Sequence, residues 1–280
     1  MNNRRLSRRE FLQSTAIAGA IAANPWNAVL AQSRRVNNIG LQVYSLRREM
    51  AQDFAGTLEK LSELGFKEIE FAGYFDYSPS EIRRILDRLG LTSPAAHIQL
   101  TAIRTDLERE IESAATIGQK YIVVPSLPDD ERTLDHYQRH AELLNRAGEA
   151  SKAAGIKMGY HNHSFEFEQQ EGKTGYETLL SLTEADLVAM ELDLYWAVNA
   201  SQDPVTWFQN HPGRFSMLHV KDMGSDGSMV DVGRGTIDFA ELFTYADSAG
   251  FEHYFIEHDN PSDGINSIAY SYNSVNNIRF

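Results

Sequence analysis

The chain of 280 residues contains no cysteine. This absence excludes disulfide bonds, a thiol nucleophile and any zinc site built on thiolates. It also argues against iron–sulfur clusters and Cu(I), which depend on soft sulfur ligands. A metal site in this protein would have to be built from imidazole and carboxylate groups.

Positive charge is also scarce, because 26 Lys and Arg stand against 39 Asp and Glu, a formal net charge of −13. Proteins that bind nucleic acid need basic surface to neutralise phosphates, so we expect no nucleic-acid partner. Long apolar runs are missing beyond the N-terminus, so the mature chain should carry no transmembrane span.

The N-terminus has the features of an export signal. Arg8 and Arg9 lie in Ser7–Gln13 (SRREFLQ), which matches the twin-arginine pattern except at Gln13, where Lys is frequent. A short apolar stretch ends in Val29-Leu30-Ala31, the kind of site that signal peptidase cleaves. We predict a signal peptide over residues 1–31, recognised by the twin-arginine export machinery, and a periplasmic or otherwise exported protein. An ordinary basic tail and a retained N-terminal anchor are the alternatives.

The remaining residues, 32–280, repeat a strand-like run followed by a helical pattern. Gly follows five of the helical patterns, at the position where a helix end favours a left-handed residue. Ser78-Pro79-Ser80-Glu81 has the residues of a helix start, with a capping Ser, a Pro and a Glu three residues after the Ser. The predicted strands are 39–44, 67–72, 93–98, 121–125, 156–161, 187–193, 215–220 and 253–258, with a last helix near 262–278.

Eight strand–helix units in about 250 residues predict a single (β/α)8 barrel of the TIM type. Active sites of such barrels lie at the carboxyl ends of the strands. Four consecutive strands of the second half end in metal-type ligands with period-two spacing, so that each pair shares a face. The pairs are His161 and His163, Glu191 and Asp193, His219 and Lys221, and Glu257 and Asp259.

Polar pairs on one face of a buried strand are costly unless they face a wet or metal-containing cavity. We therefore predict one divalent metal ion, Mn²⁺, Co²⁺, Zn²⁺ or Mg²⁺, which could hold two neighbouring oxygens of a sugar. For any single pair, ordinary capping or hydrogen bonding is the alternative explanation.

A second set of residues is predicted near the same mouth. Glu70 and His97 end earlier strands and could touch the substrate or support the ligands. Lys221 could donate a proton to an oxyanion, or form an ion pair with Asp222. Aromatic side chains could stack on a sugar or pack in the core: Tyr44, Tyr74, Phe75, Tyr195 and Trp196. Four further imidazoles are assigned to helices or loops, with surface or structural roles: His136, His140, His211 and His253.

The order of these motifs resembles the sugar phosphate isomerase/epimerase superfamily of xylose-isomerase-like barrels, which includes inosose dehydratase-like, tagatose-epimerase-like and endonuclease-IV-like proteins. The resemblance covers about 240 residues and implies metal ligands at Asp193, His219 and Glu257. Where the superfamily often has a strand-five Glu, this chain has His161. Either His161 replaces that ligand, or His163 or Glu166 is recruited. The motifs that carry the resemblance are residues 159–167, 191–197, 218–223, 230–239 and 255–259.

The resemblance implies a carbohydrate isomerase or epimerase that abstracts a proton next to a carbonyl. Candidate catalytic residues are His163, Lys221, Glu257 and Glu70, and candidate substrate-binding residues are His97, Trp196 and Tyr44. Export and the lack of a Gly-rich phosphate cradle favour a non-phosphorylated sugar or cyclitol. The alternatives are a lyase or hydrolase of 3-keto-glycosides, metal-assisted phosphodiester cleavage, and a non-catalytic sugar-binding barrel. The substrate's identity and the formation of a homo-oligomer stay open.

Overall fold

The computed structural model describes residues 34–280, of which Arg35–Phe280 form one compact unit. The predicted signal peptide lies outside the described residues. None of the helices in the described part of the chain has the length and apolar character needed to cross a membrane.

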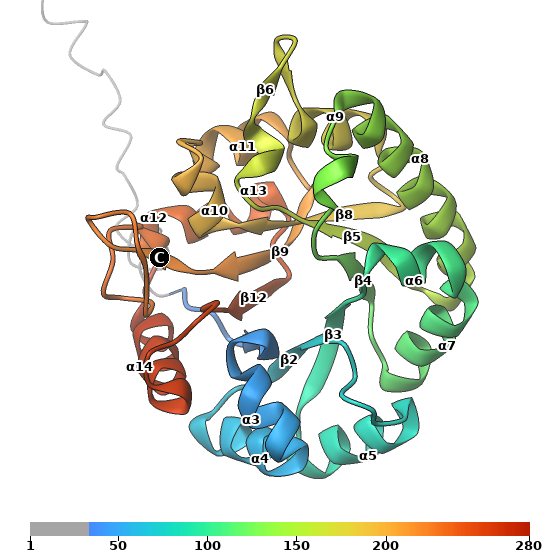
Figure 1. Cartoon of the computed structure of the whole chain (residues 1–280). Coiled ribbons are helices and arrows are strands. Elements are labelled where there is room, and N and C mark those ends of the chain that lie inside the picture. Colours follow the sequence, from blue (N-terminus) through green and yellow to red (C-terminus); the bar gives the residue numbers. More distant parts are fainter. Residues whose placement is uncertain (1–33) are drawn as a thin grey trace, which may run out of the picture. The chain divides into compact units, whose positions relative to one another are not determined.

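Eight parallel strands close into a barrel, which confirms the predicted (β/α)8 fold (Figure 1). The barrel closes because β1 pairs in parallel with both β2 and β12. Around the barrel the order is β1-β12-β9-β8-β5-β4-β3-β2. The strands are β1 (Ile39–Gln42), β2 (Glu68–Ala72), β3 (Thr92–His97), β4 (Tyr121–Val124), β5 (Lys157–His161), β8 (Val188–Asp193), β9 (Phe215–Val220) and β12 (His253–Ile256).

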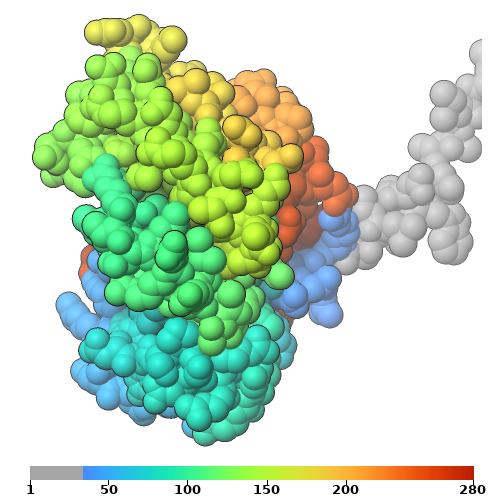
Figure 2. Space-filling model, turned by 90° about the vertical axis from the view of Figure 1, so that its right-hand side faces the viewer, coloured from blue at the N-terminus to red at the C-terminus, as the bar shows by residue number. Residues whose placement is uncertain are grey.

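Helices surround the barrel, and Figure 2 shows α5 to α8, from teal to light green, as a continuous layer on one side. The helix boundaries follow the sequence signals. Ser78 and Glu81 form a reciprocal capping box before α5, and Gly90 ends that helix with a φ of 65°. The helices are α3 (Arg47–Gln52), α4 (Phe54–Leu64), α5 (Pro79–Leu89), α6 (Leu100–Thr105), α7 (Leu107–Ile117), α8 (Leu134–Ser151), α9 (Gly175–Leu182), α10 (Leu194–Asn199), α11 (Pro204–Asn210), α12 (Phe239–Phe243), α13 (Ala246–Ala249) and α14 (Gly264–Asn277).

Two small antiparallel hairpins were not predicted from the sequence. β6 and β7 lie in the loop after β5, and β10 and β11 lie in the loop after β9. Short 3-10 turns occupy Val43–Leu46, Asp129–Glu131, Lys152–Ala154 and Phe165–Phe167. The hairpin strands are β6 (Gln169–Gln170), β7 (Lys173–Thr174), β10 (Asp222–Met223) and β11 (Met229–Val230).

The barrel interior has an apolar layer toward the amino ends of the strands and a polar layer toward their carboxyl ends. Successive inward positions of one strand show the change, because Ala189 is apolar while Glu191 and Asp193 are charged, and all three are buried. The same change occurs along β9, from Met217 to His219. The apolar layer consists of Ala95, Tyr121, Val123, Ala189, Met217 and Phe255.

His253 opens β12, as the predicted strand 253–258 requires, so its separate assignment to a helix or loop is wrong. Its Nδ1 lies 2.8 Å from Oε2 of Glu68. Gly250 ends α13, and only two residues separate it from His253. The strand begins at His253, but its apolar run begins one residue later, at Tyr254.

Candidate metal centre

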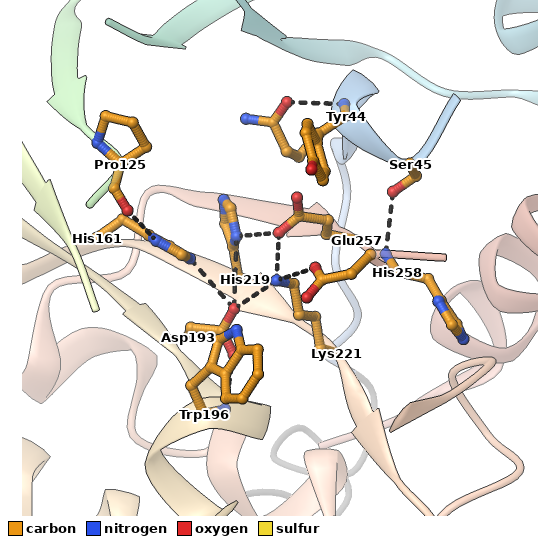
Figure 3. A network of polar contacts seen from close by, with 12 residues as sticks. Tyr44, Ser45, Pro125, His161, Asp193, Trp196, His219, Lys221, Glu257 and His258 are labelled. Atoms are coloured by element: carbon orange, nitrogen blue, oxygen red, sulfur yellow. Dashed lines mark hydrogen bonds and ion pairs between the residues drawn. The ribbon is translucent and has the colours of Figure 1, made fainter. Parts of the chain in front are cut away.

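The carboxyl ends of β5, β8, β9 and β12 bring together two imidazoles and two carboxylates, as Figure 3 shows. Ligand atoms of His161, Asp193, His219 and Glu257 all lie within 4.8 Å of one another. The strand register explains the meeting, because Asp193 is paired with His219, and Phe255, two residues before Glu257, is paired with the same His219. These are the four residues predicted as metal ligands, and the structure brings all four together.

Hydrogen bonds orient both imidazoles for metal binding. Nδ1 of His161 lies 3.0 Å from the carbonyl oxygen of Pro125, so this nitrogen carries the proton and Nε2 faces Asp193 Oδ2 at 3.2 Å. Nε2 of His219 lies 2.7 Å from Glu70 Oε2, which leaves Nδ1 facing Glu257. A partner that fixes the proton on the far nitrogen is the usual arrangement for a metal-binding histidine.

One contact in this group suits a cation in particular. Nδ1 of His219 and Oε2 of Glu257 are 2.7 Å apart, and the same oxygen lies 2.6 Å from Nζ of Lys221. Burial would lower the pKa of His219, but Glu191, Glu257 and Glu70 raise it well above its ordinary value, so the ring is protonated and pairs with Glu257. A divalent cation could replace the Nδ1 proton between these two atoms, so the donor set fits the predicted metal.

Asp193 is held firmly by the neighbouring backbone. Its Oδ1 accepts a hydrogen bond from the amide of Trp196 at 2.9 Å and so caps α10. Its own amide donates to Oδ1 of Asn162 at 2.9 Å, which ties the end of β8 to the end of β5. The second carboxylate oxygen, Oδ2, is left to face His161 and Lys221.

Lys221 lies among three carboxylates rather than beside Asp222 alone. Its Nζ is 3.0 Å from Asp193, 2.6 Å from Glu257 and 2.8 Å from Asp259. The carboxylate of Asp222 instead accepts hydrogen bonds from the backbone amides of Gly233, Gly235 and Ile237. The alternative of a local Lys221–Asp222 ion pair is therefore wrong, because Asp222 is used to close the loop after β9.

The ionisation of these groups follows from their burial and their neighbours. Burial alone would raise the pKa of Asp193 and of Glu257, but Lys221 and the imidazoles hold both well below their usual range. Burial would lower the pKa of Lys221, yet Asp193 and Glu257 raise it well above its ordinary value. Burial lowers the pKa of His161, and the ring of His219 adds to this effect. The carboxylates are thus ionised at neutral pH and available to a cation.

Glu70 and His97 lie beside the centre, near Nε2 of the His219 ring. Glu70 is fully buried, contacts Nε2 of His219 and does not line the cavity above. His97 lines the cavity and places Nε2 2.7 Å from Oε2 of Glu191. Burial and the neighbouring carboxylate of Glu191 raise the pKa of Glu70 to about 7, while imidazole contacts hold the pKa of Glu191 well below its usual range.

The other predicted residues divide between the cavity and its wall. His163 lines the cavity, and burial together with the ring of His161 lowers its pKa to about 3. Tyr44 also lines it and is 42% exposed. Trp196 lies beside the cavity lining, with its ring 5.5 Å from that of His163. Glu166 points away from the metal ligands, accepting hydrogen bonds from the Tyr160 hydroxyl and the His163 amide.

Above the four ligands lies a cavity of about 590 Å³ at the carboxyl ends of the strands. Among its described lining residues Lys221 is the only lysine or arginine, whereas Glu110, Glu257 and Asp259 add three carboxylates. Such a lining suits a neutral polyol better than an anion. The lining consists of Tyr44, Ala72, Gly73, Tyr74, His97, Ile98, Gln99, Ala102, Glu110, Pro125, Ser126, His161, His163, Lys221, Glu257, Asp259 and Asn260.

Sequence reasoning did not assign a role to two buried polar residues near the centre. Asn162 ties two strand ends, and Gln42 is buried with an unpartnered Nε2. The period-two rule that selected Glu191 and Asp193 could have found Gln42, since it also lies on a barrel strand. No comparable signal marks Asn162, because it follows the last residue of β5.

Comparisons with known proteins agree with this architecture. The family model described as xylose isomerase-like TIM barrel matches residues 58–271. An inosose dehydratase of Geobacillus kaustophilus is 24% identical over 261 residues, which cover 79% of this chain and 82% of that protein. A 2-oxo-tetronate isomerase of Haemophilus influenzae is 24% identical over 223 residues, covering 72% of this chain and 85% of that protein.

Solved structures resemble the chain in the same way. A sugar phosphate isomerase/epimerase from Parabacteroides distasonis has a TM-score of 0.73 and 29% identity, covering 86% of this chain and 95% of that one. The IOLI protein, solved with a zinc atom, has a TM-score of 0.67 at 14% identity, covering 85% of this chain and 95% of that one. The second likeness concerns the fold alone.

Proposed function

The chain belongs to the xylose isomerase-like TIM barrel family, and from this premise we propose that it is a metal-dependent enzyme acting on a non-phosphorylated sugar or cyclitol. Its chemistry would be proton abstraction next to a carbonyl, with isomerisation or epimerisation as the outcome. Relatives named as inosose dehydratase and 2-oxo-tetronate isomerase support an enzyme of this general kind.

The observation that carries the proposal is the convergence of His161, Asp193, His219 and Glu257 beneath an open cavity. A cation held there would act as a Lewis acid, polarising the substrate carbonyl and making the neighbouring C–H more acidic. The ligand set suits Zn²⁺, Co²⁺ or Mn²⁺, and the zinc atom of the IOLI protein is consistent with that choice.

The chain's own residues supply the proton transfers. Lys221 is charged at neutral pH and lines the cavity, so its Nζ can donate a hydrogen bond to a substrate oxygen that gains negative charge. His163 is neutral because of its low pKa, and its buried Nδ1 has no hydrogen-bond partner. Glu257 and the neutral ring of His163 are the cavity side chains that offer a basic atom for a proton from carbon.

The lining also supports the substrate class. A phosphate group would enter a cavity whose three carboxylates already compensate its one ammonium group, so its charge would be repelled. The hydroxyl groups of a neutral sugar could instead be bound by Asp259, Asn260 and Gln99. Tyr44 and Tyr74 line the same cavity and provide aromatic faces.

A second candidate is β-elimination, in which the abstracted proton is followed by loss of water or of an aglycone from a 3-keto-glycoside. The presence of His161 where the superfamily often has a carboxylate favours this outcome. Epimerases of the tagatose-epimerase type use two carboxylates on opposite sides of the carbon, and this chain keeps only Glu257 of that pair. Elimination requires proton abstraction on one side only, with Lys221 placed to protonate the leaving group.

One experiment tests the proposal and separates its outcomes. The Zn²⁺- or Co²⁺-loaded protein is incubated in D₂O with a panel of free sugars, inososes and 3-keto-glycosides, and products are followed by NMR. Deuterium on a carbon next to the carbonyl without loss of a group indicates isomerisation or epimerisation. Loss of water or aglycone indicates elimination. Tight binding of a sugar without exchange or turnover would mean a non-catalytic sugar-binding barrel and would defeat the proposal.

A matched pair of variants connects the activity to the centre. Glu257→Gln should lose both bound metal and turnover, because the amide keeps the shape of the side chain but not its charge. Glu59→Gln makes the same change on the exposed surface of α4 and should change neither. Turnover that survives in Glu257→Gln and after chelation of the metal would exclude this mechanism.

A further inference from the structure

A second group of ligand atoms lies on the other side of the His219 ring from the metal centre. Ligand atoms of Glu70, His97, Glu191 and His219 lie within 4.8 Å of one another. They come from β2, β3, β8 and β9, so the group shares only His219 with the centre above. Nδ1 of that ring faces Asp193 and Glu257, whereas Nε2 faces Glu70 and Glu191.

Two distances in this group are those of hydrogen bonds, and two are close to the spacing of ligands around a bound cation. Nε2 of His219 is 2.7 Å from Glu70 and 3.3 Å from Glu191, and Nε2 of His97 is 2.7 Å from Glu191 and 3.6 Å from Glu70. Ligand atoms at tetrahedral corners about 2.1 Å from a metal are roughly 3.4 Å apart. Small side-chain movements would therefore open a four-coordinate site between the two nitrogens and the two carboxylates.

The hydrogen bonds within the described residues do not satisfy these carboxylates. Glu70 and Glu191 are both 0% exposed, and Oε1 of each has no hydrogen-bond partner. Their ion pairs are with the imidazoles of His97 and His219 alone. Among the described residues the two imidazoles are the only groups that can offer these buried carboxylates a positive charge, and a divalent cation bound to the same four side chains could supply that charge instead.

We propose that Glu70, His97, Glu191 and Nε2 of His219 bind a second divalent cation, and that His219 bridges the two cations as an imidazolate. Binding displaces the Nε2 protons of both His97 and His219, which now face Glu191 and Glu70, and both protons leave to solvent. Two nitrogen and two carboxylate ligands without sulfur favour Zn²⁺, Co²⁺ or Mn²⁺. The inference goes beyond the proposed function, which needs only a cation held by His161, Asp193, His219 and Glu257.

Metal counting at equilibrium tests this site directly. The full chain and its variants are dialysed against increasing Co²⁺, and bound cobalt per chain is measured by mass spectrometry of the metal. We expect two equivalents for the wild type and one for Glu70→Gln. Glu68→Gln is the matched control, because Glu68 lies two residues earlier on β2 and also pairs with a histidine, His253. That variant should keep two equivalents.

Two further measurements keep the result interpretable. If Glu70→Gln does not fold, Glu191→Gln takes its place with the same expected loss of one equivalent. In the wild type loaded with Mn²⁺, an imidazolate bridge should give an exchange-coupled electron paramagnetic resonance spectrum rather than that of isolated ions.

The outcomes separate cleanly. A single equivalent in the wild type, two equivalents in Glu70→Gln, or a spectrum of isolated Mn²⁺ at two equivalents would each overturn the second site. None of these results affects the proposed function, whose failure would appear as absence of turnover in the D₂O experiment.

Discussion

Lys221 has an environment in which few lysines are found. It is 1% exposed, and its ammonium group is surrounded by Asp193, Glu257 and Asp259. A buried charge persists only where its partners compensate the loss of solvation. Because these three carboxylates keep Lys221 protonated, its role can be donation of a proton or hydrogen bond but not abstraction.

Lys221→Met tests this role. The methionine fills a similar volume but cannot donate, so we expect kcat to fall by about 100-fold or more, the usual contribution of a general acid. Bound metal should be retained, because the four ligands are unchanged. The measurements are steady-state turnover and metal content, with Lys120→Met on the exposed surface as the control. An unchanged kcat would contradict the assignment.

Glu166 should make stability depend on pH. Burial raises its pKa from 4.5 to about 8, outweighing the hydrogen bonds from Tyr160 and the His163 amide. Between those values the folded state holds a proton that the unfolded state has released, so stability falls as pH rises. From pH 5 to pH 8 we expect the wild type to lose roughly 5 °C more in Tm than Glu166→Gln.

The measurement is thermal unfolding at several pH values, and Glu168→Gln provides the control. Glu168 is an exposed carboxylate two residues away, so its replacement should leave the wild-type pH dependence unchanged. If wild type and Glu166→Gln show parallel curves, Glu166 does not hold a proton in the folded state.

At the residue scale, the sequence predicted the inward direction of most site residues but not their depth. Period-two spacing placed Glu191 and Asp193 on one face correctly, yet Glu191 lies a layer deeper and meets His97 instead of the cavity. Trp196 was expected at the cavity, but Asp193 caps α10 and the helix turns the indole onto His163. Such positions depend on how eight strands tilt around one axis, which no local pattern records.

At the scale of elements, strands and helix ends were the most predictable parts. The five helices expected to end in Gly do so, at Gly65, Gly90, Gly118, Gly155 and Gly250, each with positive φ. This works because a left-handed residue at a helix end is a local requirement. The hairpins β6–β7 and β10–β11 were missed because two-residue strands are too short for any period to appear.

Gly40 shows how one element limits another inside the barrel. A Cβ at this position of β1 would lie 2.5 Å from Cδ1 of Phe255 and 3.2 Å from Cβ of Glu68. Phe255 is fully buried in the apolar layer and has no room to move. We expect Gly40→Ala to lower the free energy of unfolding by about 1–3 kcal/mol, as overpacking does in other cores.

Denaturant unfolding measures this effect, and a second substitution identifies its cause. Phe255→Leu removes the ring that the new Cβ would meet, so Gly40→Ala should cost less in the Phe255→Leu background than in the wild type. Equal costs in both backgrounds would mean that the contact with Phe255 is not responsible.

At the scale of the whole molecule, the fold concentrates negative charge where a cation is expected. The chain carries a formal charge of −13, and five carboxylates lie at the carboxyl end of the barrel, where they contact the imidazoles or Lys221. Four are buried, Glu70, Glu191, Asp193 and Glu257, and Asp259 is half-buried. The field of such a site attracts cations and repels anionic substrates.

The barrel topology was predictable because eight repeated units admit few other closed arrangements, whereas the reaction was not, since one barrel supports many chemistries.

The N-terminal segment bears on where the metal is acquired, and we propose that the chain is exported in its folded form. Replacement of Arg8 and Arg9 by Lys should keep the charge but abolish recognition by the twin-arginine machinery. The variant should accumulate in the cytoplasm with residues 1–31 uncleaved, whereas the unaltered chain should appear outside it as a shorter product.

Cell fractionation measures where the protein accumulates, and intact mass measures whether residues 1–31 have been removed. Replacement of Arg4 and Arg5 by Lys, outside the Ser7–Gln13 motif, is the control and should be exported normally. Equal export of the two variants would show that this motif does not direct the protein.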